Sequence, residues 1–283
     1  MNYRHAFHAG NFADVVKHAV LARVLAYLRQ KNAPFRVIDT HAGGGLYDLT
    51  GDEATRGGEW RQGINRLFTA SPRPEISALL APYLDAVAAL NPDGALRRYP
   101  GSPLIARAML RPQDRLIACE LEPKAAAALR HSLRGDPRLK PVEIDGWTAL
   151  AAYVPPKERR GLVLIDPPFE QPGEFARLAE GLAGALRKWP GGIYLAWYPL
   201  KDAQETGSFR RKLTRLGIPK ILRAEIELPA IAGTTRLRGS GLAIVNPPWT
   251  LETELALLLP ALGAILSEGG QSAIRLDWLA SEK

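Results

Sequence analysis

The sequence predicts an α/β fold built on a mostly parallel sheet. Strand-like apolar runs alternate with helical patterns along the chain, and four successive runs each end in polar or acidic residues. A third observation, an irregular interval between the first two strands, indicates an insertion into that fold. We therefore expect a Rossmann-like core that carries a small helical insertion.

The first predicted element is a helix with Asn11 as its N-cap and Asp14 at the third helical position, extending to about Lys31. A second helix is expected to start at Pro123, because proline is favoured in the first turn of a helix. The remaining apolar runs predict strands at Phe35–Asp39, Arg115–Cys119, Pro141–Ile144, Leu162–Ile165, Ile193–Trp197, Ile221–Leu228 and Leu242–Val245.

The interval between the first two strands, residues 40–114, is far longer than a β–α–β crossover needs. It contains two helical patterns, Trp60–Phe68 and Ile76–Leu90, separated by a Ser-Pro-Arg-Pro turn sequence. We therefore expect residues 53–95 to form an inserted helical subdomain, and residues 1–52 and 96–283 to form the Rossmann-like core. An ordinary long connection is the alternative.

Composition limits the class of protein and of partner. The chain has 37 Lys and Arg against 29 Asp and Glu, a net charge of +8, which favours polyanionic partners. A single cysteine, Cys119, excludes an internal disulfide and a multi-cysteine metal site, and its apolar context predicts an inert core residue. No run of 18 apolar residues and no apolar N-terminal signal pattern occurs, so we expect a cytoplasmic protein.

The tetrapeptide Asp166-Pro167-Pro168-Phe169 directly follows the buried-strand pattern of Leu162–Ile165. It suits methylation of a planar amine such as the exocyclic nitrogen of adenine. The lone pair of that nitrogen is delocalised, so a carboxylate and a backbone carbonyl that accept its two hydrogens draw it toward tetrahedral geometry. Pro168 adds no competing N–H, and the Phe169 ring can stack on a base that leaves its helix. The alternative is a strand followed by a Pro-Pro turn.

Four consecutive predicted strands end in polar residues: Asp39 with His41, Glu120, Asp145 and Asp166. In open α/β sheets, ligands lie at this edge. If the ligand is S-adenosylmethionine, Glu120 would accept hydrogen bonds from both ribose hydroxyls. Asp145 would accept a hydrogen bond from the adenine amine of the cofactor, with the Gly146 backbone close by. The glycine run 43–45 would let the backbone approach the ligand. A single acid at the end of a strand more often caps a turn or a helix. The indication of a ligand site comes from the four strand ends taken together.

An oxidoreductase that uses a nicotinamide dinucleotide is an alternative on the same fold. It needs the pattern G-x-G-x-x-G directly after the first strand. In the segment HAGGGLYD, Gly43 and Gly45 satisfy the first two positions, but the third falls on Asp48. An acid there would also lie near the phosphates, so the segment argues against dinucleotide binding.

Chemically active residues gather near the N-terminus, where His5, His8 and His18 lie close together in sequence. No cysteine or acid pattern completes a metal site around His5 and His8, so no metal is expected. Lys17 continues the apolar face of the predicted helix, and the methionine carboxylate of the cofactor would give this cation an anionic neighbour. A capped amphipathic helix with a disordered tail is the alternative.

Motifs from Tyr3 to Trp249 resemble those of the bacterial RlmJ family, the 23S ribosomal RNA (adenine(2030)-N6)-methyltransferases. These motifs are YRHAFHAGNFADVVKH, DTHAGGGLYDL, RYPGSPLIA, ELEP, DGW, RRGLVLIDPPFE, IYLAWYP and VNPPW. The resemblance implies a Rossmann-like class I S-adenosylmethionine-dependent methyltransferase with a small helical insertion. It implies Asp166 as the catalytic acid and S-adenosyl-L-methionine contacts at Lys17, His18, His41, Ser102, Glu120, Asp145, Gly146 and Asp166. Ser102 could instead cap the helix that follows it.

The same resemblance implies a substrate, 23S ribosomal RNA, methylated at the N6 amine of one adenine. Tyr3 and Arg4 combine a stacking ring with a phosphate-seeking charge, and Phe169 is the third expected RNA contact. Phe169 replaces the tyrosine that is common at this motif position, which keeps the ring and loses a hydroxyl. We expect a monomer without membrane, metal or obligate protein partner. The alternatives are methylation of DNA adenine or of a protein glutamine amide, and an RNA-binding protein with an inactive cofactor pocket.

A second tetrapeptide, Asn246-Pro247-Pro248-Trp249, also follows an apolar run and fits the same motif. In the topology that the chain resembles, the last strand is antiparallel to the others. Its C-terminal end therefore points away from the ligand edge of the sheet. We expect Asn246 to lie more than ~15 Å from the methyl group of the cofactor, given a rise of ~3.3 Å per residue. The segment is interpreted as a structural turn in which Trp249 packs against the protein.

Overall fold

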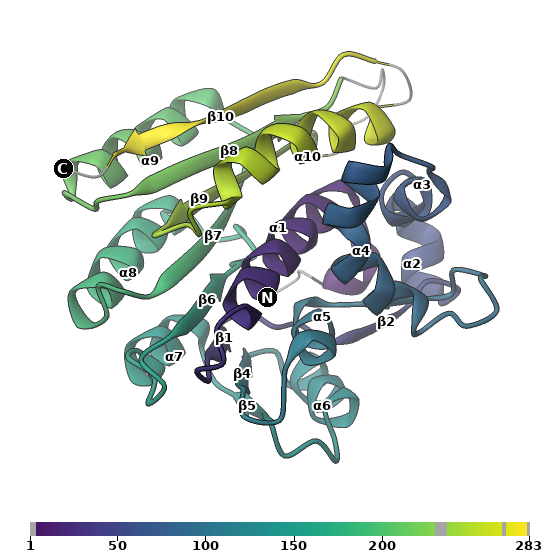
Figure 1. The fold of residues 1–283 in the computed structure, drawn as a ribbon, viewed down its shortest axis with the longest axis horizontal. Coiled ribbons are helices and arrows are strands. Elements are labelled where there is room, and N and C mark those ends of the chain that lie inside the picture. The colour runs from purple at the N-terminus through teal and green to yellow at the C-terminus, as the bar shows by residue number, and fades with distance from the viewer. Residues whose placement is uncertain (1–3, 230–236, 268–269, 282–283) are drawn as a thin grey trace.

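The computed structural model describes residues 4–229, 237–267 and 270–281. One large sheet lies between two layers of helices, and a group of short helices lies at one side of it (Figure 1). The α/β class predicted from the sequence is confirmed.

In the described part of the chain, eight strands form the main sheet, in the order β10-β8-β9-β7-β6-β1-β4-β5. The strands from β5 to β7 are parallel, whereas β9 is antiparallel to both of its neighbours and β10 is antiparallel to β8. The strands are β1 (Arg36–Asp39), β4 (Arg115–Glu120), β5 (Leu139–Glu143), β6 (Gly161–Ile165), β7 (Ile193–Pro199), β8 (Ile221–Glu227), β9 (Gly239–Val245) and β10 (Ala273–Ala280).

Helices cover both faces of this sheet (Figure 1). Side chains of α1, α5, α6 and α10 share one hydrophobic cluster with one face, and those of α8 and α9 share another with the opposite face. The helices are η1 (His5–Phe7), α1 (Phe12–Arg29), α2 (Asp52–Gly57), η2 (Glu59–Arg61), α3 (Ile64–Thr69), α4 (Pro74–Ala88), α5 (Ser102–Met109), α6 (Pro123–Ser132), α7 (Gly146–Tyr153), α8 (Glu174–Lys188), α9 (Ala203–Arg215) and α10 (Leu251–Leu266). Within the described ranges, no helix is long and apolar enough to span a membrane.

The central strand β6 determines where Asp166 points. All five residues of β6 are buried, as expected for a parallel strand covered on both faces. Leu162 and Leu164 belong to the cluster on the α1 side, whereas Val163 and Ile165 belong to the cluster on the α8 side. Because side chains alternate along a strand, Asp166 follows Ile165 on the α1 side of the sheet.

The predicted start of α1 is confirmed. The side chain of Asn11 accepts a hydrogen bond from the backbone N–H of Asp14 at 2.9 Å. α6 begins at Pro123 as predicted, with the Glu122 side chain as its cap. Both starts satisfy backbone donors that have no partner inside the helix.

The interval between β1 and β4 contains five helical segments, α2, η2, α3, α4 and α5, and a two-stranded sheet that the sequence did not predict. That sheet pairs β2 (Leu46–Asp48) with β3 (Arg98–Pro100). The expected helix at Trp60–Phe68 is interrupted because Gly63 packs on the N-terminal segment, where an added Cβ would lie 2.1 Å from the Gly10 carbonyl oxygen. Side chains of α3 and α4 join the cluster of α1, and the division into a core and an inserted subdomain stays a prediction.

Two expectations about the C-terminal part of the chain are wrong. β9 is antiparallel, as predicted, but it is not the last strand, because β10 follows it as the edge strand next to β8. Trp249 does not pack against the protein, since it is 80 % exposed. Along β10, Ile274, Leu276 and Trp278 alternate with Arg275 and Asp277, so the sequence does carry the period-two pattern of a strand, although none of its residues is fully buried.

Cys119 is fully buried beside Ile117 and Ala149. Burial raises the pKa of its thiol to about 12. The thiolate form that would react is therefore suppressed at neutral pH, in agreement with an inert core cysteine.

Asn246 lies at the opposite edge of the sheet from Asp166. Its side chain donates to the carbonyls of Pro190 and Gly192, which precede β7, at 2.7 and 2.8 Å. The strand register places Asn246 level with Ile193 of β7, and Asp166 level with Trp197 of the same strand. Asn246 and Asp166 are therefore separated by about 13 Å in the direction of the strands.

We expect Asn246→Ala to leave turnover and cofactor affinity within about twofold of the original protein. It should lower the free energy of unfolding by about 1–3 kcal/mol, because it removes two hydrogen bonds and places alanine at a φ of 52°. Urea unfolding and methyl-transfer kinetics measure both quantities. Loss of turnover in a folded variant would contradict the strand order.

Candidate active site at the C-terminal edge of the sheet

The centre of the site is a buried chain of three charged groups. The Lys17 ammonium lies between the Asp14 carboxylate, at 2.8 Å, and the Asp166 carboxylate, to which it donates a very short hydrogen bond. Lys17 and Asp14 are almost fully buried, and the side chain of Asp166 keeps 16 % of its surface exposed. Burial alone would lower the pKa of Lys17, but Asp14 and Asp166 outweigh it and raise that pKa. The lysine is therefore a permanent cation beside Asp166.

The N-terminal motif folds around Asp14. Its carboxylate also accepts from the backbone N–H of Gly10 at 2.9 Å and contacts the His5 ring nitrogen Nε2 at 3.0 Å. Burial would raise the pKa of Asp14, but Lys17 and His5 hold it well below its usual range. The motif thus positions an anion inside the protein, and that anion holds the lysine.

The histidines of this motif contact acids rather than a metal-ligand cluster. His8 hydrogen-bonds to Glu59 at 3.1 Å, which raises the pKa of His8, while His5 contacts Asp14. Within the described residues, no group of His, Cys, Asp and Glu has the arrangement of a metal site.

His18 points into the core rather than toward Asp166. It is 1 % exposed, its ring nitrogen Nδ1 contacts the Tyr99 hydroxyl at 2.6 Å, and that hydroxyl contacts Tyr83 at 2.8 Å. Burial lowers the pKa of His18 to about 3, so the ring is neutral. Of the two residues expected at the cofactor, Lys17 is the one that reaches Asp166.

Asp39, at the end of β1, forms a second buried anionic position near Asp166. Its Oδ2 accepts from the Ser102 hydroxyl at 2.6 Å, whereas Oδ1 has no hydrogen-bond partner among the described residues. Burial, with Asp166 adding to it, raises the pKa of Asp39 to about 7 against the opposing Ser102 bond and Lys17. Sequence reasoning noted Asp39 as a strand end but gave it no role. Ser102 does not cap α5, so that alternative is wrong.

Glu120, at the end of β4, holds the glycine loop. Its two carboxylate oxygens accept from the backbone N–H groups of Gly43 and Glu122, each at 2.8 Å. Gly43 has a φ of 62°, and a Cβ there would lie 2.2 Å from the Tyr47 hydroxyl, so only glycine fits. Each Glu120 oxygen can still accept one further hydrogen bond.

Asp145 and Gly146 complete the edge beside β5. Asp145 Oδ2 accepts from the backbone and hydroxyl of Thr148 and therefore caps α7. A Cβ on Gly146 would lie 2.5 Å from His41 Nε2, so this backbone is packed directly on His41. Burial lowers the pKa of His41 to about 4, and its ring contacts Trp147 edge-on at 5.4 Å. The three predicted positions His41, Asp145 and Gly146 therefore lie together at this edge.

Aromatic rings border Asp166 on the other side. The Phe169 ring contacts Phe175 at 4.8 Å and lies edge-on to Trp197 at 5.7 Å, measured between ring centroids. The Lys17 ammonium lies 5.9 Å from the Trp197 ring. Sequence reasoning missed Trp197, because a tryptophan inside a strand looks like an ordinary core residue.

The predicted RNA contacts at the N-terminus are described only in part. Arg4 is largely exposed and pairs with Glu53 of α2 at 2.5 Å. Tyr3 lies outside the described residues.

The donor and acceptor set fits S-adenosylmethionine. The unpartnered Asp39 Oδ1 is a buried acceptor suited to an ammonium group, and Glu120 has lone pairs left for two hydroxyls. Gly43 and Gly146 provide backbone without side chains on the same edge. Lys17 is already paired with two carboxylates, Asp14 and Asp166.

The raised pKa of Asp39 makes a prediction about stability. A carboxyl whose pKa rises from 3.8 in the unfolded chain to about 7 in the folded protein adds stability below about pH 4, and that contribution is lost as the pH rises toward 7. Asn does not titrate. We expect Asp39→Asn to gain stability relative to the original protein by on the order of 1–4 kcal/mol between pH 4 and pH 8. Urea unfolding across this range measures the difference, and a difference independent of pH would contradict the assignment.

Comparisons with known proteins agree with this geometry. A model of the family "Ribosomal RNA large subunit methyltransferase D, RlmJ" matches residues 32–280. Ribosomal RNA large subunit methyltransferase J of Escherichia coli K12 is 39 % identical over 282 residues, and that of Haemophilus influenzae is 38 % identical over 283 residues. Both matches cover all of this chain and all of the relative.

The fold has a close relative among solved structures. A protein from Legionella pneumophila strain Philadelphia 1 has a TM-score of 0.87 and 35 % identity, covering 96 % of this chain and 98 % of its own. A probable spermidine synthase from Corynebacterium glutamicum has a TM-score of 0.51 at 15 % identity, covers 95 % of this chain and 75 % of its own, and shows only the shared fold. Together with the full-length relatives, these matches establish that the chain belongs to the RlmJ family of ribosomal RNA large subunit methyltransferases.

Proposed function

We propose that this protein methylates the N6 amine of one adenine in 23S ribosomal RNA, with S-adenosylmethionine as the methyl donor and Asp166 as the catalytic acceptor. Family membership gives the reaction class, a methyl transfer to ribosomal RNA. Position 2030 follows from the resemblance of the motifs and is part of the proposal.

One observation carries the assignment to an amine. The Asp166 carboxylate lies directly after the buried strand β6, on the edge where the other strand-end acids gather, and is held from one side by Lys17. Lys17 binds Oδ2, so Oδ1 remains to accept a hydrogen from the substrate. The next residues supply the Pro167 carbonyl as a second acceptor and the Phe169 ring as a stacking surface.

The chemistry needs little from the protein beyond geometry. Bound S-adenosylmethionine supplies an electrophilic methyl group. Asp166 and the Pro167 carbonyl accept the two N–H hydrogens of the adenine amine, and these bonds strengthen as the nitrogen becomes tetrahedral. Lys17 holds the Asp166 carboxylate in one orientation, which reduces the entropy lost in reaching the reactive geometry. Asp166 then gives the proton of the methylated amine a path to solvent.

The cofactor would lie along the edge formed by β1, β4 and β5. We assign its ammonium to Asp39, its ribose hydroxyls to Glu120 and its adenine amine to Asp145 beside Gly146. His41 and Ser102 hold this edge in shape, since His41 packs on Gly146 and Ser102 orients Asp39. His18 would act indirectly, by fixing α1 through Tyr99.

The RNA would approach the same edge from solvent. Arg4 and the Phe169 ring are our proposed contacts, together with Tyr3, and the net charge of +8 favours a polyanion. We further propose that the protein acts as a monomer in the cytoplasm and needs no metal.

A comparison of substrates tests the proposed function. Purified protein is given labelled S-adenosylmethionine with protein-free 23S RNA, adenine-containing DNA or a glutamine-containing protein. We expect N6-methyladenine in the RNA alone. Preferred methylation of DNA or of protein would replace this proposal with one of the alternatives.

The role of Asp166 is tested by Asp166→Ala. We expect RNA methylation to fall at least about a hundredfold, because an acceptor that acts mainly in the transition state is lost. Cofactor affinity should stay within roughly tenfold, about 1.4 kcal/mol, as calorimetry would measure. Asn246→Ala is the matched control, since it alters the second tetrapeptide. Near-normal turnover by Asp166→Ala would remove this residue from the mechanism.

A further inference from the structure

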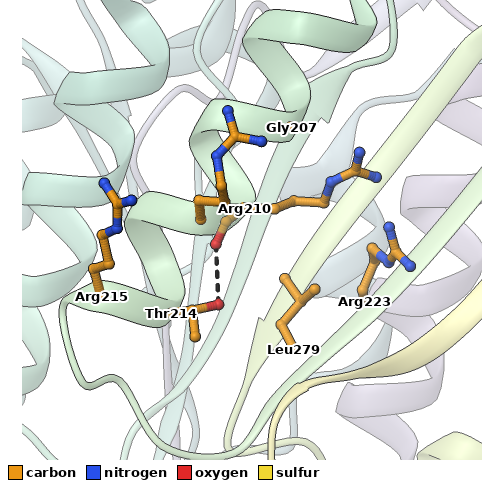
Figure 2. A pocket seen from close by; sticks show the side chains of 7 residues that line it. Gly207, Arg210, Thr214, Arg215, Arg223 and Leu279 are labelled. Atoms are coloured by element: carbon orange, nitrogen blue, oxygen red, sulfur yellow. Dashed lines mark hydrogen bonds between the residues drawn. The ribbon is translucent and has the colours of Figure 1, made fainter.

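Away from the candidate active site, residues of α9, β8 and β10 line a shallow, open pocket of about 510 Å³ that is rich in arginine. Arg210, Arg211 and Arg215 come from α9, and Arg223 comes from β8 (Figure 2). Leu279 of β10 faces them. We call this group the arginine pocket.

The helix places its arginines on one side by spacing alone. Arg211 and Arg215 are four residues apart, so they are neighbours on the surface of α9. Gly207, one turn earlier, has no side chain, and the guanidinium groups of Arg211 and Arg210 come within 3.4 and 3.9 Å of where its Cβ would lie. Glycine thus leaves room for two guanidinium groups to fold over the same surface.

Only part of this positive charge is neutralised. Arg223 forms two hydrogen bonds of 2.6 Å with Asp277, and Arg210 pairs with the buried Glu225 at 3.1 Å. Within the described residues, no carboxylate pairs with Arg211 or Arg215, and both are exposed. Two adjacent cations of the same helix therefore repel each other, and an anion between them would relieve that repulsion.

The pocket and Asp166 lie on opposite faces of the sheet. Arg223 is level with Ala243 of β9, which is level with Ala196 of β7 and Ile165 of β6. Three strand spacings separate β8 from β6, or about 14 Å. Arg223 points to the α9 face, whereas Asp166 lies on the α1 face, and α9 runs back toward Lys220, whose carbonyl accepts from the backbone of Asn246 at the opposite edge. An RNA bound at Asp166 would therefore reach the pocket with a part of its chain that is remote from the target adenine.

We propose that the arginine pocket binds backbone phosphates of the substrate RNA and holds a part of the RNA that is remote from the target adenine. Planar guanidinium groups match the geometry of phosphate oxygens and bind them in pairs. This proposal rests on the proposed function, because the phosphates are those of the methylated RNA. It assigns the pocket to substrate affinity and not to the chemical step.

The test uses the double variant Arg211→Gln/Arg215→Gln in the full-length protein. KM for 23S RNA should rise on the order of tenfold while kcat stays unchanged, because phosphate contacts add affinity without sequence information. Direct binding of the RNA by fluorescence anisotropy should lose about one unit of slope, in log Kd against log salt, for each arginine removed. Cofactor affinity by calorimetry should not change.

A charge-matched double variant, Lys212→Gln/Arg187→Gln, is the control. Both residues lie on the neighbouring surface of α8 and α9 and do not line the pocket, and Lys212 already pairs with Glu180. Equal KM values and equal salt slopes for the two double variants would overturn the arginine pocket as a phosphate site. If the unaltered protein does not methylate RNA, the proposed function fails, and the anisotropy measurement still decides whether the pocket binds RNA.

Discussion

The ion chain Asp14–Lys17–Asp166 is the interaction on which the site depends. A lysine in the core keeps its charge only beside an anion, and Asp14 and Asp166 both supply one. Removing one partner from such a buried group costs about 3–5 kcal/mol, because the remaining charge is left without compensation. The chain also joins α1 to the end of β6, two segments far apart in the sequence. The position of Asp166 therefore depends on correct packing of the N-terminal helix.

Topology provides the second constraint. Parallel strands β1, β4, β5 and β6 bring Asp39, Glu120, Asp145 and Asp166 to one edge of the sheet. Antiparallel β9 delivers Asn246 to the opposite edge. Two tetrapeptides that share a central Pro-Pro pair thus lie at opposite edges of the sheet, because their strands run in opposite directions.

The sequence was sufficient to predict those elements that depend on residues close together in the chain. The Asn11 cap, the start of α6 at Pro123 and the seven predicted strands depend on residues near one another in the chain. Likewise, the grouping of the strand-end acids follows from the parallel order of the strands. The family resemblance added the assignment of individual residues, which the geometry supports only in part, since His18 is turned into the core.

The sequence could not predict contacts between residues that are far apart in the chain. Lys17 has an anionic neighbour, Asp14, three residues earlier on α1, but only the fold brings Asp166 to it. Asp39 resembles any strand-end acid until burial and Ser102 are known, and these shift its pKa.

The short strands β2 and β3 carry too little apolar pattern to be recognised, whereas the edge strand β10 carries an alternating pattern that indicates a strand. The arginine pocket was not foreseen for a further reason: it exists only because α9 packs beside β8 and β10.

The central claim is that Asp166, held by Lys17, directs methylation to one adenine amine of 23S ribosomal RNA. Its most direct test is mass spectrometric mapping of N6-methyladenine in 23S RNA from cells that lack this protein. We expect one methylated adenine to be absent, to return when the original protein is supplied, and to stay absent when Asp166→Ala is supplied at equal abundance. An unchanged methylation map, or full restoration by the Asp166 variant, would contradict the claim.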